Sequence, residues 1–458
     1  MIHGRSARFH GIDCANSFRV TPKRHQCPPP CDNNCMLTRR CFLLTASAAA
    51  AAAAEPALPP AIAALPNRRA EAYPIPVAER ESRLDRARAL MRANRIDAIA
   101  LTGGTSLDYF TGIRWGGSER LFAFILPQKG NPLYVCPAFE EDRVRERMGQ
   151  APNGRESRIL TWQEDNDPYA LVALALREAG VISGSLGIEE RVPFVFSDGI
   201  RKAGGGAKNA SGGIELTGAT PVTAGCRSVK SPAELKLMQL ANDVTLQVYE
   251  AAWKSLKPGM TNRQFSDLID AAYRQIGFPG HASCQVDAWS ALPHGSLQPQ
   301  VIREGSLVLI DDGCVVEGYQ SDISRTFVIG KPTDKMKRVF DVVHKAQTAA
   351  LNAAKPGVAC QAVDSAARKV IDDAGFGPGY AHFTHRLGHG IGMDGHEWPY
   401  LVKGNTQPLQ ANMTTSDEPG IYLQGEFGVR LEDDMYITPD GAKLFTSQSN
   451  SLEDPFAK

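Results

Sequence analysis

The sequence has no excess of charge of either sign. Its 458 residues carry 50 Lys and Arg against 50 Asp and Glu, so the formal net charge is zero. Proteins that bind nucleic acid normally show a basic excess, and this balance argues against that class of partner. The 22% of charged and 43% of hydrophobic residues are ordinary for a globular protein, and the length suffices for two or three domains with cores of their own.

The apolar run at residues 41–54 is too short to span a bilayer. It has about 14 residues, whereas a spanning helix needs roughly 20. Arg39 and Arg40 precede it, and small residues and a Pro-rich stretch follow it. This layout is typical of a twin-arginine secretory signal. We therefore expect a signal segment over 36–63, cleaved near Ala54 or near residues 61–63, and an exported, periplasmic protein with no membrane span after signal removal.

Residues 1–35 lie upstream of this signal, although a signal begins near the start of its chain. Met36 stands three residues before Arg39, so the true start is Met1 or Met36. We interpret 1–35 as a non-native or disordered leader. A disordered cytoplasmic leader is the alternative for the signal itself.

Disulfide scaffolding is also missing from the rest of the chain. Five of the ten cysteines remain after the leader and the signal segment, and they are widely scattered: Cys136, Cys226, Cys284, Cys314 and Cys360. An odd, scattered set does not form a disulfide framework. The twin-arginine route exports folded proteins, often with a cofactor already bound, so a cofactor becomes a first expectation.

Two domains are predicted. Residues 73–222 alternate helical and strand patterns, which indicates an α/β domain. The boundary is marked by "VKSPAELKLM", where Ser231 caps a helix, Pro232 suits its first position and Glu234 completes a capping box. The second domain, 226–452, contains an internal repeat: "KPGMTNRQFSDLIDAAYRQIGF" from Lys257 matches "KPGVACQAVDSAARKVIDDAGF" from Lys355. Two related halves usually place a functional site in the crevice between them.

Four acids stand at the start or the end of strand-like runs in the second domain. Asp311 ends the apolar run at 307–310, and Asp322 precedes a second run. Glu418 and Glu432 repeat this arrangement in "SDEPGIYLQGEFGVRLEDD". Carboxylates are costly to bury unless they are paired or bind metal. With His389 they form a set of one imidazole and four carboxylates, which suits two bridged divalent ions such as Mn²⁺, with Zn²⁺ or Co²⁺ also able to bind.

The stretch "HRLGHGIGMDGHEWPY" at 385–400 gathers three histidines and four glycines. His385 and His389 have the i, i+4 spacing of a helical zinc motif. However, each glycine costs roughly 1 kcal/mol in a helix. Strand and loop are therefore predicted here, with backbone packed close to the metal crevice.

These segments resemble a known family. "LIDDGCVVEGYQSDISRTF", "HRLGHGIGMDGHEWP", "SDEPGIY" and "GVRLEDD" look like the signature segments of the dinuclear pita-bread metallopeptidases. The resemblance is strong over about 225–450, and the domain before it resembles the N-terminal domain of the aminopeptidase P, prolidase and creatinase branch. The fold it implies is an α/β creatinase/prolidase-like N-terminal domain followed by an α+β pita-bread catalytic domain.

The resemblance also implies residue roles. The metal ligands it implies are Asp311, Asp322, His389, Glu418 and Glu432, with Asp322 and Glu432 bridging the two ions. Glu418 is expected to move a proton towards the leaving amine and His396 to steady the tetrahedral intermediate. His294 matches a substrate-side histidine, and Arg430 an arginine that contacts substrate or orients the site. His385 has no assigned role; support of the site and packing are equally open.

The implied activity is hydrolysis of the bond between an N-terminal residue and proline. We favour an Xaa-Pro dipeptidase (prolidase) over an Xaa-Pro aminopeptidase acting on longer peptides; the loop at 107–120, with Trp115, is the candidate for deciding between them. A creatinase-like C–N hydrolase and a non-catalytic binding module are remote alternatives, since both lose the ligands that are intact here. The family suggests a homodimer. One departure is noted: the family often has a tyrosine near the place of Gly280, and no tyrosine stands there.

Overall fold

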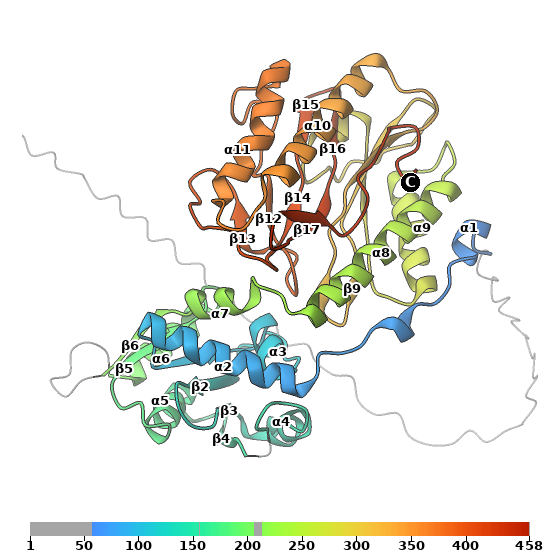
Figure 1. Cartoon of the computed structure of the whole chain (residues 1–458). Helices are drawn as coiled ribbons and strands as arrows, with labels where there is room; N and C mark the ends of the chain where they lie inside the picture. Colours follow the sequence, from blue (N-terminus) through green and yellow to red (C-terminus); the bar gives the residue numbers. More distant parts are fainter. Residues whose placement is uncertain (1–56, 155, 206–212, 458) are drawn as a thin grey trace, which may run out of the picture. The chain divides into compact units, whose positions relative to one another are not determined.

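The N-terminal domain is built on one six-stranded sheet in the computed structural model, which describes residues 57–154, 156–205 and 213–457 (Figure 1). Neighbouring strands of this sheet are parallel, except that β1 (Ala98–Leu101) and β3 (Leu133–Pro137) both run antiparallel to β2 (Ala123–Pro127). Three of its six strands, β1, β2 and β3, are buried along their whole length, as expected when helices cover both faces. In spatial order the strands are β4 (Arg158–Trp162), β3 (Leu133–Pro137), β2 (Ala123–Pro127), β1 (Ala98–Leu101), β5 (Gly184–Ile188) and β6 (Ile214–Gly218).

Helices pack on both faces of this sheet. One core joins the sheet to α2, α3, α4 and α7, and a second joins it to α5 and α6. The alternation of strands and helices predicted for 73–222 is thus observed. The helices are α2 (Val77–Asn94), α3 (Thr105–Thr111), α4 (Glu141–Met148), α5 (Pro168–Glu178), α6 (Phe194–Ala203) and α7 (Thr220–Arg227).

The predicted loop at 107–120 is a loop only in its second part. Residues up to Thr111 belong to α3, where Leu107 and Phe110 are buried in the core. Trp115 follows in the loop and stacks on Phe122 with ring centroids 4.6 Å apart.

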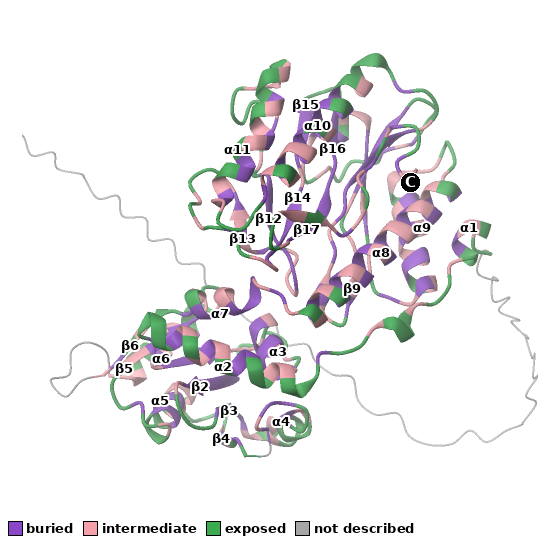
Figure 2. Ribbon diagram, viewed as in Figure 1, coloured by how far each residue is buried: buried purple, intermediate pink, exposed green. Residues whose placement is uncertain are grey.

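The second domain contains two larger sheets and two small hairpins. The first sheet has the order β11 (Arg325–Val328), β8 (Leu307–Asp311), β7 (Ser283–Val286), and the second has the order β13 (Glu397–Leu401), β12 (Gly388–Gly390), β14 (Thr414–Asp417), β17 (Asp433–Ile437), β18 (Ala442–Leu444). The hairpins are β9 (Val315–Val316) with β10 (Tyr319–Gln320), and β15 (Gly420–Leu423) with β16 (Phe427–Arg430). Buried residues gather along these strands and on the inward faces of the helices (Figure 2).

The sequence repeat corresponds to two helix pairs. The pairs are α8 (Pro232–Ser255) with α9 (Asn262–Ile276), and α10 (Asp334–Ala353) with α11 (Cys360–Ile371). The predicted capping box is present. Ser231 Oγ accepts from the Glu234 backbone N–H at 3.2 Å, and the Glu234 carboxylate accepts from the Ser231 backbone N–H at 2.8 Å. Each pair is followed by strands that carry site residues.

The predicted signal segment, 36–63, overlaps a packed helix. Within it, α1 (Pro60–Ala63) packs against α8 and α9, and Ile62 is fully buried in the core of the second domain. Cleavage near residues 61–63 would remove this core residue. Cleavage near Ala54 would leave it in place. The leader and the rest of the signal segment, residues 1–56, lie outside the described residues.

Among the described residues, no helix is both long and apolar enough to cross a membrane. The five cysteines of this part of the chain are all free and buried, in agreement with the absence of a disulfide scaffold.

Candidate metal centre

The five predicted ligands come from five separate places in the second domain and meet in one cavity. Asp311 ends β8, and Asp322 lies between β10 and β11. His389 is the middle residue of β12, Glu418 stands between β14 and β15, and Glu432 lies between β16 and β17. The cavity has a volume of about 320 Å³, and all five side chains line it. Its other lining residues are Pro293, His294, His385, Arg386, His396 and Arg430.

The ligand atoms fall into two clusters with one shared member. Asp311, Asp322 and Glu432 place one oxygen each within 4.8 Å of one another, and His389, Glu418 and Glu432 do the same with their donor atoms. Glu432 belongs to both clusters, as a carboxylate that bridges two ions must. Four carboxylates and one imidazole therefore fit a pair of hard or borderline divalent ions, which is the arrangement of two-metal hydrolytic sites.

The charges of the cavity also favour bound cations. Burial and the neighbouring carboxylates raise the pKa values of Asp322 and Glu432 well above their ordinary range. A charged carboxylate is thus costly in this place unless a cation neutralises it. Arg430 is the only guanidinium that forms ion pairs with the ligands among the described residues, reaching Asp311 and Glu432.

His389 and Glu418 form a pair. His389 Nε2 lies 3.2 Å from Glu418 Oε1 and 3.9 Å from Asp322 Oδ2. Burial lowers the pKa of His389, but the bond to Glu418 and the charges of Glu418 and Asp322 together outweigh it and raise that pKa to about 9. Burial opposes ionisation of Glu418 too, yet the same bond and the positive charges around it together hold its pKa at about 2. A metal ion that binds here must displace the proton from the imidazole.

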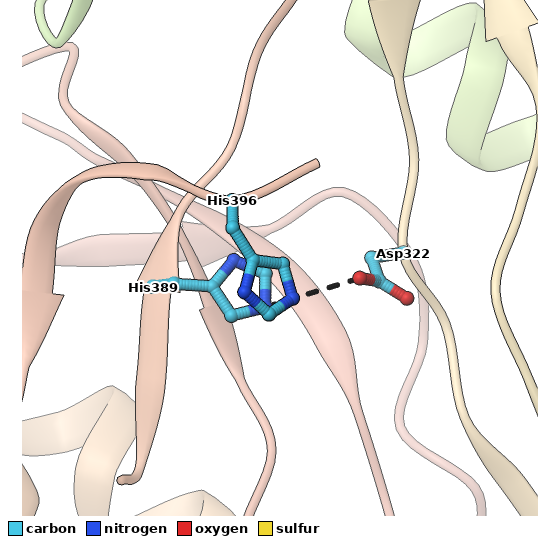
Figure 3. Close-up of side chains that lie close together, drawn as sticks. All are labelled: Asp322, His389 and His396. Atoms are coloured by element: carbon cyan, nitrogen blue, oxygen red, sulfur yellow. Dashed lines mark ion pairs between the residues drawn. The ribbon is translucent and has the colours of Figure 1, made fainter. Parts of the chain in front are cut away.

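His396 lies over His389. The two imidazole rings are stacked with centroids 3.7 Å apart, and both face the Asp322 carboxylate (Figure 3). Burial and the charge of His389 lower the pKa of His396 to about 4. The ring is therefore neutral near pH 7 and can donate one N–H to an uncharged or negative oxygen in the cavity.

The other predicted residues take different positions around the cavity. His294 lies on the wall, in the loop after the 3₁₀ turn Asp287–Ala291. Arg430 is buried behind the ligands, and its Nε donates to Ser324 Oγ at 2.8 Å. The ring of His385 is fixed by two hydrogen bonds: its Nε2 is 2.7 Å from Tyr422 Oη, and its Nδ1 is 2.8 Å from the Arg386 carbonyl. The same Nδ1 stands 3.7 Å from the predicted ligand Glu418.

Sequence reasoning missed four residues around the ligands. Ser324 Oγ bonds both Asp311 Oδ1 and Glu432 Oε2. Asp434 accepts from the Asp322 backbone N–H at 3.0 Å. The Tyr422 hydroxyl joins His385 to Arg430. Arg386 lines the cavity with its guanidinium 4.5 Å over the Tyr400 ring. All four stand inside the recognised motifs, so the motifs could have found them, but their contacts need the fold.

Gly280 stands at the place where the family often has a tyrosine, and it is tightly packed. A Cβ added at Gly280 would lie 2.7 Å from the buried ring of Tyr273. Gly280 also forms a bridge with Cys314. The tight packing explains why glycine stands here, and it leaves this wall of the site without a phenol.

Comparison with known families assigns both domains. Residues 236–439 match Metallopeptidase family M24, and residues 83–229 match the Creatinase/Prolidase N-terminal domain. These ranges agree with the α/β domain and the domain that carries the ligands. The fold predicted from the sequence is confirmed.

This chain aligns with similar proteins over almost the whole length of those proteins. The chain is 32% identical to an Xaa-Pro dipeptidase of Lactobacillus helveticus, over 81% of this chain and 98% of the relative. The crystal structure of the dipeptidase PepE from Mycobacterium ulcerans is similar with a TM-score of 0.76 at 31% identity, covering 83% and 99% of the two chains. An Xaa-Pro dipeptidase structure from Bacillus anthracis gives a TM-score of 0.70 at 26% identity, covering 82% and 99%.

Proposed function

This chain belongs to metallopeptidase family M24, and from that premise we propose that it is an Xaa-Pro dipeptidase. The reaction is metal-dependent hydrolysis of the bond between an N-terminal residue and proline, with a free dipeptide as substrate. An Xaa-Pro amide has no N–H and a fixed proline φ, so peptidases that grip that N–H fail on it. The relatives named Xaa-Pro dipeptidase and the paired carboxylate clusters support the proposal.

The observation that carries the dipeptide preference is Arg386. Its guanidinium lines the metal cavity, and no ion pair joins it to a carboxylate within the described ranges. A dipeptide ending in proline brings a free carboxylate into this cavity, whereas a longer peptide brings a neutral amide there. We assign Arg386 and His294 to that carboxylate. Electrostatic complementarity of this kind separates a dipeptidase from an aminopeptidase.

The ligand set would hold two divalent ions, for which we propose Mn²⁺ because four of five ligands donate oxygen. When bound, such ions polarise the scissile carbonyl and make an attacking water acidic. The chain's own groups do the rest. Glu418 accepts a proton from the attacking water at a carboxylate oxygen and delivers it to the proline nitrogen. His396, neutral near pH 7, donates a hydrogen bond to the carbonyl oxygen as negative charge develops on it.

Arg430 and His385 keep these groups in place. Arg430 fixes Asp311 and Ser324, and His385 lies between Tyr422 and Glu418. Preorganised ligands and proton carriers lower the barrier because no reorganisation is needed during the reaction. Arg430 is thus assigned the orienting role rather than substrate contact.

We further propose export to the periplasm by the twin-arginine-type segment and assembly as a homodimer. The arginine pair, the short apolar run and the buried free cysteines support export of a folded protein. Sedimentation of the purified protein tests the homodimer, and fractionation of cells expressing the full chain tests export.

Release of proline tests the activity. Purified protein with added Mn²⁺ is expected to hydrolyse Ala-Pro and to act poorly on Ala-Pro-Ala. Asp322→Ala is expected to abolish hydrolysis, whereas Asp440→Ala, at an exposed carboxylate in a turn, should leave it unchanged. Faster hydrolysis of the tripeptide would establish an aminopeptidase instead. Failure on both substrates, with metal bound, would refute the assignment to Xaa-Pro bonds.

A further inference from the structure

His396 lacks fixed partners of its own. Within the described ranges its ring nitrogens take part in no side-chain hydrogen bond, and its ring is held only by stacking on His389. A hydrogen-bond donor must nevertheless stand within a few tenths of an ångström of its acceptor to stabilise a transition state. The position of this imidazole must therefore come from the segment that carries it, residues 392–397, which we call the His396 loop.

Groups outside the His396 loop hold its backbone carbonyls. The backbone N–H of Gln320 donates to Gly392 O at 2.8 Å, and its side-chain amide donates to Met393 O at 2.9 Å. Arg191, from the N-terminal domain, donates to the carbonyl of His396 itself at 3.2 Å. The loop is thus fixed from both domains.

The two acids of the His396 loop enter a buried ion cluster. Arg227 pairs with Asp394 at 2.6 Å and also with Glu397, and Lys230 pairs with Glu397 at 2.6 Å. The side chains of Arg227, Lys230 and Glu397 are 6%, 1% and 3% exposed. Charges buried this deeply persist only when each has its partner, so the cluster permits one arrangement of the loop.

The cations of this cluster lie where the N-terminal domain joins the second domain. Arg227 is the last residue of α7, and Lys230 lies just before α8. Thr105, at the start of α3, donates to Asp394 at 2.6 Å, and Arg227 also donates to Ser106 at 3.2 Å. A cavity of about 150 Å³ beside the cluster is walled by residues of both domains, among them Glu189 and Asp394.

We propose that this cluster of Arg227, Lys230, Asp394 and Glu397, together with Arg191, is the device by which the N-terminal domain positions His396 in the metal cavity. These are positioning residues, since they act through the loop and do not touch the substrate. The inference rests on the proposed function in one respect, the role of His396 towards the substrate carbonyl. It also gives the N-terminal domain a part in the reaction.

A double-mutant cycle with His396 tests the proposal. Two variants are suited to this test, because their side chains reach solvent and the fold should tolerate the change. They are Asp394→Asn, whose side chain is 22% exposed, and Arg191→Gln, whose side chain is 61% exposed. In the otherwise native protein, each is expected to lower kcat for Ala-Pro about tenfold, with KM and bound metal little changed. In a His396→Ala background the same changes should lower kcat less than about twofold, because the group they position is gone.

Glu79→Gln is the matched control. Glu79 is 19% exposed, lies on α2 and joins the N-terminal domain to Ser231 at 2.7 Å, away from the His396 loop. Its effect on kcat should be small and equal in both backgrounds. Equal losses for Asp394→Asn with and without His396 would overturn the proposal, since they would show a general structural effect.

A second measurement is independent of catalysis. Amide hydrogen exchange over residues 391–398 should quicken in Asp394→Asn and Arg191→Gln and stay unchanged in Glu79→Gln. Unchanged exchange in the first two variants would overturn the positioning role even if the protein hydrolysed Ala-Pro. If His396→Ala alone left Ala-Pro hydrolysis intact, the role of His396 in the proposed function would fail, and the exchange result would still decide whether the cluster holds the loop.

Discussion

Arg430 uses four of its five guanidinium N–H donors inside the protein. Its Nε bonds Ser324, one terminal nitrogen bonds Pro293 O and Tyr422 Oη, and the other bonds Asp311. The sequence offered Arg430 for either substrate contact or orientation, and these contacts favour orientation. Arg386 lines the same cavity and forms no ion pair within the described ranges, so it is the better candidate for the substrate carboxylate.

Arg386→Gln is expected to change the substrate preference rather than the chemistry. A charge-assisted bond contributes roughly 1.5–3 kcal/mol, reduced here by solvent, so kcat/KM for Ala-Pro should fall about tenfold. The value for Ala-Pro amide, which lacks the carboxylate, should stay the same. Arg338→Gln is the matched control, because Arg338 is also exposed and lies over an aromatic ring, that of Phe376. Equal losses on both substrates would remove Arg386 from carboxylate binding.

At the scale of single elements, β12 explains the glycines of the sequence that starts at His385. The strand lies between β13 and β14. A Cβ added at Gly388 would stand 2.1 Å from Ser416 O, and one added at Gly390 would stand 2.2 Å from Trp398 O. Glycine is required at both places because backbone approaches from each side, and this close approach sets the depth at which His389 enters the cavity.

Gly390→Ala is therefore expected to displace the strand that carries His389. Metal affinity should fall by at least about tenfold and activity should fall with it, because a ligand moved by a fraction of an ångström loses its geometry. Gly441→Ala, where the nearest atom to an added Cβ is 3.9 Å away, should behave like the native protein. Titration with Mn²⁺ followed by activity and calorimetry measures both variants. Native affinity in Gly390→Ala would show that β12 adapts to the added methyl.

At the scale of the whole molecule, the metal centre also affects the stability of the fold. The metal-free protein gathers two carboxylates, Asp322 and Glu432, that burial makes costly to ionise, and an imidazole, His389, that binds its proton tightly. Where a folded-state pKa is raised, the folded protein holds more protons than the unfolded chain, and stability falls as pH rises. Bound cations replace those protons and cancel the loss.

The stabilisation by Mn²⁺ is thus expected to grow with pH. His389 stabilises the metal-free fold fully below its unfolded pKa of about 6.5 and loses this contribution as pH rises through about 9. Asp322 and Glu432 act in the same direction, while the lowered pKa of Glu418 has no further effect above pH 6. The difference in Tm between protein with Mn²⁺ and with chelator should be larger at pH 8 than at pH 6. An equal difference in Tm at both pH values would contradict the raised pKa values of His389, Asp322 and Glu432 in the metal-free protein.

The sequence by itself determined the architecture, the internal repeat and the candidate ligand set. Strand-ending acids, capping residues and glycine spacing are local signals, and each lies within a few residues of the feature it predicts. Only the tertiary structure decided which groups meet: Arg386 at the cavity, Ser324 between Asp311 and Glu432, and the Arg227–Glu397 pair across 170 residues. Only the tertiary structure also shows that Ile62, within the predicted signal segment, is buried against α8, because this burial depends on contacts between distant segments.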